Sequence, residues 1–267
     1  MQKFRGCYNL GNAMNQPFID TDERLDTIPG TPLSLIQKID GTAFAIDTLL
    51  LANFVKFRPD MNSAADLGSG SGILAFLIKY RNPALALTGF ELQEEFIDLA
   101  NRNLQLNGQF NDVSFSLMDV RDIPARILPE SFDLVVSNPP YFQMGSGRLP
   151  TRPGRAMARH EMNGTIKDFV EAATYMLPYG GRCCMIIPTS RFYEVVEYLK
   201  AGNFGLRRLQ FVMPKEGEKS HLAMLEAERF FNGKHEPLPN IIIHMADNSF
   251  GPELKQLFSV GLKIYRP

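Results

Sequence analysis

The stretch NPPY, residues 138 to 141, combines residue types that could hold a flat amino group. It follows the apolar run FDLVVS, which is typical of a buried strand, so we expect it at the strand's carboxyl end. Asn138 has an amide oxygen, and Pro139 has a carbonyl without a competing N–H donor, so the two can accept both hydrogens of an amine. An aromatic ring at Tyr141 or Phe142 offers a face for stacking. We therefore predict Asn138, Pro139 and Tyr141 as catalytic residues and Phe142 as a substrate contact.

A second group of candidate residues lies at the ends of three expected strands further upstream. The glycine-rich sequence DLGSGSG, residues 66 to 72, lies at a strand-to-helix turn, where glycines let the backbone approach a ligand closely. Glu91 ends the next expected strand, where a carboxylate can accept both hydroxyls of a ribose. A nicotinamide dinucleotide is an alternative ligand, but the glycine spacing differs from G-x-G-x-x-G, and the turn lacks the lysine of a phosphate-binding loop. The predicted cofactor-binding residues of this group are Asp66, Gly68, Gly70, Gly72, Glu91 and Asp119.

The elements that must position these residues alternate between short apolar runs and helical patterns. Such alternation predicts a parallel sheet with helices on both of its faces. In the last third, at about residues 206 to 246, helical periodicity is weak, and antiparallel strands closing one edge of the sheet are expected. The predicted strands of the parallel part are SAADLG, ALALTGFE, DVSFSLMD, FDLVVS and RCCMIIP, and the predicted helices between them are ILAFLIKY, QEEFIDLANRNLQLNG, TIKDFVEAATYML and SRFYEVVEYLKAG.

The composition argues against several classes of protein. The chain of 267 residues is 45% hydrophobic and 21% charged, as in globular domains, and no apolar run approaches the ~18 residues of a membrane span. The first residues do not resemble a secretory signal, so we expect a cytoplasmic protein without membrane contact. With a net charge of −1 the protein surface is not basic as a whole, so any nucleic-acid site must be confined to one part of the surface. Three cysteines, Cys7, Cys183 and Cys184, are too few and too badly spaced for a disulfide framework or a zinc site, and no metal is predicted.

Taken together, DLGSGSG, Glu91, Asp119 and NPPYF resemble the class I S-adenosylmethionine-dependent amino-methyltransferases over about residues 40 to 190. The stretches LSLIQKIDGTAFAIDTLLLANF, ARHEMNGTIKDFVEAATYML and MPKEGEKSHLAMLEA are similar to the bacterial enzymes that methylate adenine N6 next to the anticodon of valine tRNA.

The resemblance implies a Rossmann-like α/β fold with a seven-stranded, mostly parallel sheet, an antiparallel C-terminal edge and helices on both faces. It implies S-adenosylmethionine as the cofactor, with Gln37 and Asp47 in a segment that packs over it and Asp119 near the adenine amino group. We expect an N-terminal extension at residues 1–40, a methyltransferase domain at residues 41–267 and a substrate loop at about residues 143–164.

Methylation of an exocyclic or amide nitrogen is the chemistry that suits the NPPY turn. The lone pair of such a nitrogen is delocalised, so it attacks the sulfonium methyl poorly. Two acceptors holding both of its hydrogens favour tetrahedral geometry and stabilise the positive charge that develops during transfer. No metal is needed, and no general base is evident.

A basic loop supports a nucleic-acid substrate, with tRNA as the expected partner. The sequence GRLPTRPGRAMARH follows NPPY and contains no acidic residue. Guanidinium groups bind phosphates and stack on bases, although a solvated loop is the alternative interpretation. The predicted substrate-binding residues of this loop are Arg148, Arg152, Arg155 and Arg159.

Other functions remain open at this stage. Enzymes that methylate the glutamine amide of release factors also carry NPPY, but they would be expected to have a larger helical domain before the cofactor motif. A non-catalytic RNA-binding protein on the same fold would not need the acids and Asn138. An oxygen methyltransferase would have only one hydrogen for the two acceptors to hold. No obligate protein partner is evident, and a monomer is expected.

Overall fold

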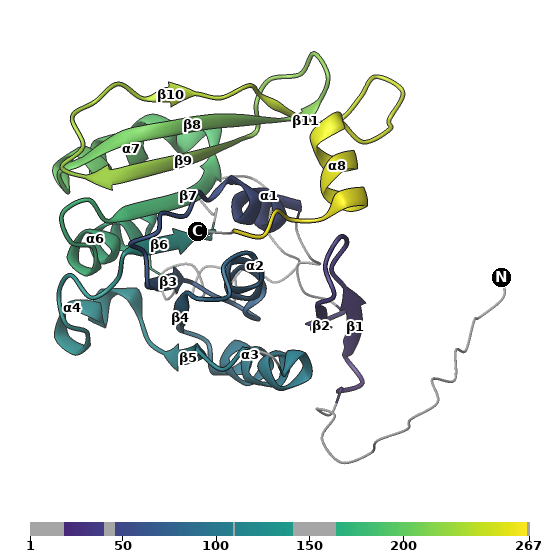
Figure 1. Ribbon diagram of the computed structural model, residues 1–267, viewed down its shortest axis with the longest axis horizontal. Coiled ribbons are helices and arrows are strands. Elements are labelled where there is room, and N and C mark those ends of the chain that lie inside the picture. The colour runs from purple at the N-terminus through teal and green to yellow at the C-terminus, as the bar shows by residue number, and fades with distance from the viewer. Residues whose placement is uncertain (1–18, 40–45, 109, 141–163, 266–267) are drawn as a thin grey trace, which may run out of the picture.

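A central sheet with helices on both faces organises the computed structural model, which describes residues 19–39, 46–108, 110–140 and 164–265 (Figure 1). Five parallel strands run in the order β5, β4, β3, β6, β7. β6 is buried throughout and β7 nearly so, as expected of parallel strands covered on both faces. Their bounds are Ser63–Leu67 for β3, Ala86–Glu91 for β4, Val113–Leu117 for β5, Leu134–Ser137 for β6 and Arg182–Pro188 for β7.

The C-terminal strands extend this sheet beyond β7. β9 (Leu222–Arg229) pairs antiparallel with both β7 and β8 (Phe204–Lys215). The short β10 (Glu236–Pro237) and β11 (Ile241–His244) then run parallel to β8. The described sheet therefore has nine strands rather than the predicted seven, and β11 is not antiparallel as expected. The reason is that β9 returns the chain to the start of β8, and the chain then follows the free side of β8 in the same direction.

Two apolar layers hold the helices against the sheet. Alternate sheet residues face opposite layers, as in β6, where Val135 packs on one side and Leu134 and Val136 pack on the other. α1, α2 and α8 share the layer of Leu134, and α6 and α7 share the layer of Val135. This confirms the predicted α/β fold with helices on both faces. The helices are α1 (Ile46–Phe54), α2 (Ile73–Arg81), α3 (Glu94–Asn107), α4 (Ile123–Arg126), α6 (Ile166–Met176), α7 (Phe192–Ala201) and α8 (Pro252–Val260), with 3-10 turns at Val120–Asp122 and Thr189–Arg191.

An antiparallel hairpin, β1 (Glu23–Thr27) and β2 (Ser34–Lys38), precedes the sheet and packs against α3. The side chain of Asn103, fully buried on α3, accepts a hydrogen bond from the Ile36 N–H at 2.7 Å and donates to the Ile36 carbonyl at 3.1 Å. Asn107 bonds the backbone of Ser34 in the same way. Two amide side chains therefore satisfy one side of β2 as a neighbouring strand would, and they fix the hairpin next to α3.

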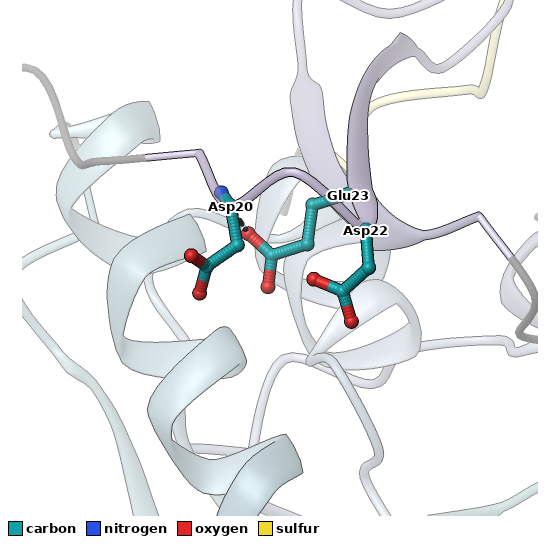
Figure 2. Close-up of side chains that lie close together, drawn as sticks. All are labelled: Asp20, Asp22 and Glu23. Carbon is teal, nitrogen blue, oxygen red and sulfur yellow. Dashed lines mark hydrogen bonds between the residues drawn. The ribbon is translucent and has the colours of Figure 1, made fainter.

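Three acids lie side by side at the start of this hairpin: Asp20, Asp22 and Glu23 (Figure 2). The two carboxylate oxygens of Glu23 accept hydrogen bonds from the Arg102 guanidinium of α3, each at 2.7 Å, and one of them also accepts from the Asp20 N–H. The hydrogen bonds from Arg102 lower the pKa of Glu23 to about 2. Because Glu23 is already bound in this way, we assign it the structural role of clamping the hairpin to α3.

Two further observations bear on the composition. Among the described residues, no helix combines the length and the apolar character needed to cross a membrane. Cys183 and Cys184 are fully buried in β7, where burial raises the pKa of the Cys183 thiol to about 12. They are core residues, as expected, while Cys7 lies outside the described part of the chain.

Candidate active site

The predicted site residues that the structure describes, apart from Gly72, line one cavity of about 630 Å³ at the carboxyl ends of β3, β4, β5 and β6. The two groups that the sequence suggested separately therefore face the same space. Tyr141, Phe142, Arg148, Arg152, Arg155 and Arg159 lie outside the described residues. The residues of the prediction that line the cavity are Gln37, Asp47, Asp66, Gly68, Gly70, Glu91, Asp119, Asn138 and Pro139.

The glycine-rich turn after β3 needs glycine for two different reasons. Gly68, Gly70 and Gly72 all have positive φ, at 72°, 53° and 86°, which side chains rarely adopt. A Cβ on Gly70 would meet nothing within 4 Å, so there the backbone conformation alone requires glycine. A Cβ on Gly72 would come within 2.7 Å of the rings of Phe76 and Phe115, so Gly72 serves the packing of the turn behind the cavity.

Glu91 joins the end of β4 to the glycine-rich turn. One carboxylate oxygen accepts a hydrogen bond from the Gly70 N–H at 2.9 Å, and the other accepts from the Gln93 N–H at 2.9 Å. A carboxylate has about four acceptor positions, so each oxygen keeps the capacity to accept one more hydrogen bond. The arrangement holds a carboxylate at the cavity wall in a fixed orientation, and two adjacent hydroxyl groups could bind it.

Asp66, at the end of β3, carries the most perturbed carboxyl group of the cavity. It is 1% exposed, and one of its oxygens has no hydrogen-bond partner among the described residues. Burial raises the pKa of Asp66 to about 8, and the nearby charge of Glu91 adds to the increase. A buried carboxylate oxygen without a partner costs free energy unless a ligand compensates it. A cationic group bound in the cavity would provide that compensation.

Asp119 follows β5 and is less buried than Asp66. It caps the following 3-10 turn by accepting a hydrogen bond from the Arg121 N–H, and its carboxylate also accepts from the Arg121 guanidinium, both at 2.9 Å. These hydrogen bonds lower the pKa of Asp119 below its ordinary value. A ligand at this end of the cavity therefore meets an ionised carboxylate that Arg121 holds in place.

The opposite wall of the cavity contains Asn138 and Pro139. Just before them, the Ser137 hydroxyl donates to the Leu67 carbonyl at 2.8 Å, which ties the end of β6 to the end of β3. The Asn138 side-chain nitrogen donates to the Thr48 hydroxyl of α1 at 3.3 Å. Pro139 is buried, so its rigid backbone forms part of the cavity wall. The amide of Asn138 is therefore bound by a residue that lies far from it in the sequence.

Two predicted residues come from the segments that precede the sheet. Gln37 lies on β2 and is 4% exposed. Asp47 lies in the first turn of α1, where burial raises the pKa of its carboxyl group. The hairpin and α1 therefore both contribute to the wall of the cavity.

Sequence reasoning missed several residues of the cavity wall, among them Thr48, Ser69 and Phe169. Phe169 was identified only as part of the apolar face of its helix, yet its ring lies 3.1 Å from where a Cβ on Gly68 would stand. Ser69 could have been predicted from the sequence, because it lies within the glycine-rich turn. No local signal distinguishes Thr48 or Phe169 from other residues of apolar helices.

Comparisons with known proteins agree with this architecture. The family model of the methyltransferase small domain matches residues 40–205. A tRNA1(Val) (adenine(37)-N6)-methyltransferase from Aeromonas hydrophila is 27% identical over 73% of this chain and 79% of its own length. An enzyme of the same name from Porphyromonas gingivalis is 27% identical over 72% of this chain and 76% of its own. The crystal structure of a predicted O-methyltransferase from Agrobacterium tumefaciens superposes with a TM-score of 0.64 at 20% identity, covering 82% of this chain and 98% of that one.

Proposed function

The chain belongs to the methyltransferase small domain family, and we propose that it transfers a methyl group from S-adenosylmethionine to N6 of an adenine in tRNA. Family membership confirms the methyltransferase activity expected from the motifs. The choice of substrate is supported by the relatives named as tRNA adenine-N6 methyltransferases, which this chain matches over more than two thirds of their length. The observation that supports the chemistry most directly is that Asn138 and Pro139 face the same cavity as Asp66 and Glu91.

The side chains around the glycine-rich turn fit S-adenosylmethionine. Glu91 is oriented by two backbone N–H groups and can accept the two ribose hydroxyls. The unpartnered oxygen of Asp66 is suited to the ammonium group of the methionine part. Asp119, ionised beside Arg121, can accept from the adenine amino group, and Gln37 and Asp47 would bound the ligand from β2 and α1. When bound, the cofactor supplies an electrophilic methyl group on a sulfonium.

The residues on the opposite wall would bind and orient the amine. The side-chain oxygen of Asn138 and the carbonyl of Pro139 accept its two hydrogens and stabilise the positive charge that develops on nitrogen during transfer. Because Ser137 is bonded to the end of β3, the amine site keeps a constant position relative to the cofactor turn. Such fixed positioning lowers the barrier of an in-line transfer. Tyr141 and Phe142 are proposed to stack on the flat base.

A direct assay tests this function. The purified protein is incubated with methyl-labelled S-adenosylmethionine and total unmodified tRNA, and the RNA is digested to nucleosides for mass analysis. The expected product is N6-methyladenosine. RNA that stays unlabelled while the protein binds S-adenosylmethionine tightly would contradict the tRNA substrate and would direct the search to protein amides.

The arginine loop gives a second test of the RNA substrate. Changing Arg152 and Arg155 together to alanine is expected to weaken tRNA binding about tenfold. The slope of log K against log salt concentration should fall by about two, because about two fewer counterions are released on binding. The matched control changes Lys200 and Lys234, two exposed lysines near the ends of α7 and β9, at the side of the sheet opposite the carboxyl ends of the parallel strands. Equal effects of the two double variants, measured by filter binding between low and high salt, would place the RNA surface elsewhere.

A further inference from the structure

The contact between Thr48 and Asn138 joins a helix that precedes the sheet to the turn that follows β6. We propose that Thr48 is a positioning residue, which orients the Asn138 amide so that its oxygen faces the methyl acceptor. The inference rests on the proposed function, because the orientation matters only if Asn138 binds an amine. It adds a determinant of reactivity that lies outside both the glycine-rich turn and the NPPY turn.

An amide side chain has a donor end and an acceptor end, and only the acceptor end suits an amine. If the amide turned by half a rotation, its N–H groups would point at the hydrogens of the substrate and repel them. The Thr48 hydroxyl accepts from the Asn138 nitrogen at 3.3 Å. With the nitrogen bound to Thr48, the oxygen lies on the opposite side of the amide group. The hydroxyl thus satisfies the amide nitrogen in the orientation that the proposed chemistry requires.

Thr48 is suited to this role because α1 is anchored at its other end. The Arg81 guanidinium donates to the carbonyls of Ala52 and Val55, the latter at 2.7 Å, and Arg208 donates to the Phe54 carbonyl at 2.8 Å. Both arginines are buried, at 8% and 5% exposure. They satisfy carbonyls that the end of a helix otherwise leaves unpaired.

Packing also limits the movement of Thr48 itself. The residue is 9% exposed, and the three leucines that follow it on α1, at positions 49 to 51, are almost fully buried in the core. In a helix the threonine side chain adopts mainly two χ1 rotamers, so its hydroxyl oxygen has few possible positions. Thr48 therefore offers a fixed hydrogen-bond acceptor at the cavity wall. Asn138, in contrast, lies outside any helix or strand, in the turn after β6.

Substitutions that separate the hydroxyl from the shape of Thr48 test the role. Thr48→Val keeps the size and removes the acceptor, and Thr48→Ser keeps the acceptor. We expect Thr48→Val to lower kcat for tRNA methylation about tenfold, which corresponds to about 1.4 kcal/mol, while the Kd for S-adenosylmethionine changes less than about twofold. Thr48→Ser is expected to retain most of the rate. Thr174→Val on α6 is the matched control, because the Thr174 hydroxyl bonds only a carbonyl of its own helix in the described hydrogen bonds.

NMR of the Asn138 side-chain amide gives a measurement that does not depend on catalysis. The side-chain NH₂ resonance of Asn138 in a nitrogen-15 spectrum can be assigned by its loss in Asn138→Asp. In Thr48→Val this resonance is expected to shift and to exchange faster with water, while it stays in place in Thr174→Val. An unchanged Asn138 resonance in Thr48→Val would overturn the inference, whatever the substrate proves to be.

A double substitution completes the test. If Thr48 acts through Asn138, adding Thr48→Val to Asn138→Ala should leave the residual rate unchanged. A further tenfold loss in the double variant would overturn the positioning role and indicate an independent effect of Thr48. Wild-type protein that leaves tRNA unlabelled would contradict the proposed function alone, since the amide resonance still decides whether Thr48 orients Asn138.

Discussion

The two walls of the cavity are built from contacts of very different range. On the side proposed to bind the cofactor, called the cofactor side or wall, Glu91 reaches Gly70 across 21 residues, and Asp119 binds Arg121 two residues further on. On the side proposed to bind the methyl acceptor, called the acceptor side or wall, Asn138 binds Thr48 across 90 residues, and Ser137 binds Leu67 across 70. The polar contacts of Glu91 and Asp119 thus join nearby parts of the sequence, while the contacts of the acceptor wall form only once α1, β3 and β6 have come together.

The walls also differ in charge. The cofactor side holds several acids, among them Asp66, which is buried with a raised pKa, and Asp119, which is ionised beside Arg121. The described polar contacts that hold Asn138 and Ser137 on the acceptor side are neutral hydrogen bonds. Substitutions on the cofactor side should therefore change affinity and pH dependence, and substitutions on the acceptor side should change the rate of transfer.

The largest effect should come from Asn138→Ala on the acceptor wall. We expect kcat to fall by about 10³, because a group that stabilises the transition state is lost, while the Kd for S-adenosylmethionine stays within about twofold. Single-turnover methyl transfer and calorimetric binding measure the two quantities. Asn101→Ala, at an exposed position of α3, is the control. A parallel loss of affinity and rate would remove the distinction between the two walls.

Glu91→Ala should show the opposite pattern on the cofactor wall. The variant loses both the expected ribose acceptor and the hydrogen bond to Gly70 that shapes the turn, so we expect the Kd for S-adenosylmethionine to rise about 100-fold. Titration calorimetry measures this, with Glu95→Ala at an exposed position of α3 as the control. Unchanged affinity together with a reduced kcat would contradict the assignment of Glu91.

Glu23→Gln tests whether the hairpin behind the cofactor wall depends on its clamp. The folded pKa of Glu23 is lowered, so the ion pair with Arg102 stabilises the protein above the ordinary glutamate pKa and is lost as the pH falls toward 2. At pH 7 we expect the free energy of unfolding to fall by about 2 kcal/mol in urea titrations. Asp22→Asn is the control, since Asp22 is 65% exposed and its ion pair should contribute little. Equal effects of the two variants would show that Glu23 is no clamp.

Asp66→Asn should change stability rather than the rate of transfer, and the effect should depend on pH. The folded pKa of Asp66 is raised to about 8, so the protonated form favours the folded state at low pH, and that advantage is lost as the pH rises from about 4 to 8. Without cofactor, the Tm of the wild type should therefore fall relative to Asp66→Asn between pH 5 and pH 8, by about 10 °C. Parallel Tm curves for the two proteins in scanning calorimetry would contradict the raised pKa.

Local sequence patterns determined much of the cofactor side and of the parallel sheet. Apolar runs and helical periods are properties of neighbouring residues, so the strands from β3 to β7 and the helices α2, α3, α6 and α7 could be predicted from them. The sequence also placed Asp66, Glu91, Asp119 and Asn138 at strand ends, and because the carboxyl ends of parallel strands share one edge, these residues line one cavity in the structure.

Only the tertiary structure decided how the remaining parts join this frame. The direction of β11 depends on where β9 returns the chain, and a four-residue apolar run carries no sign of that. The bonds of Asn103 to Ile36 and of Thr48 to Asn138 join residues 67 and 90 positions apart. A buried asparagine or threonine in a helix has the same local pattern whichever partner it meets. Partner choice is set by the packing of whole elements, and for that reason the contacts that hold the acceptor wall in place emerged only from the folded chain.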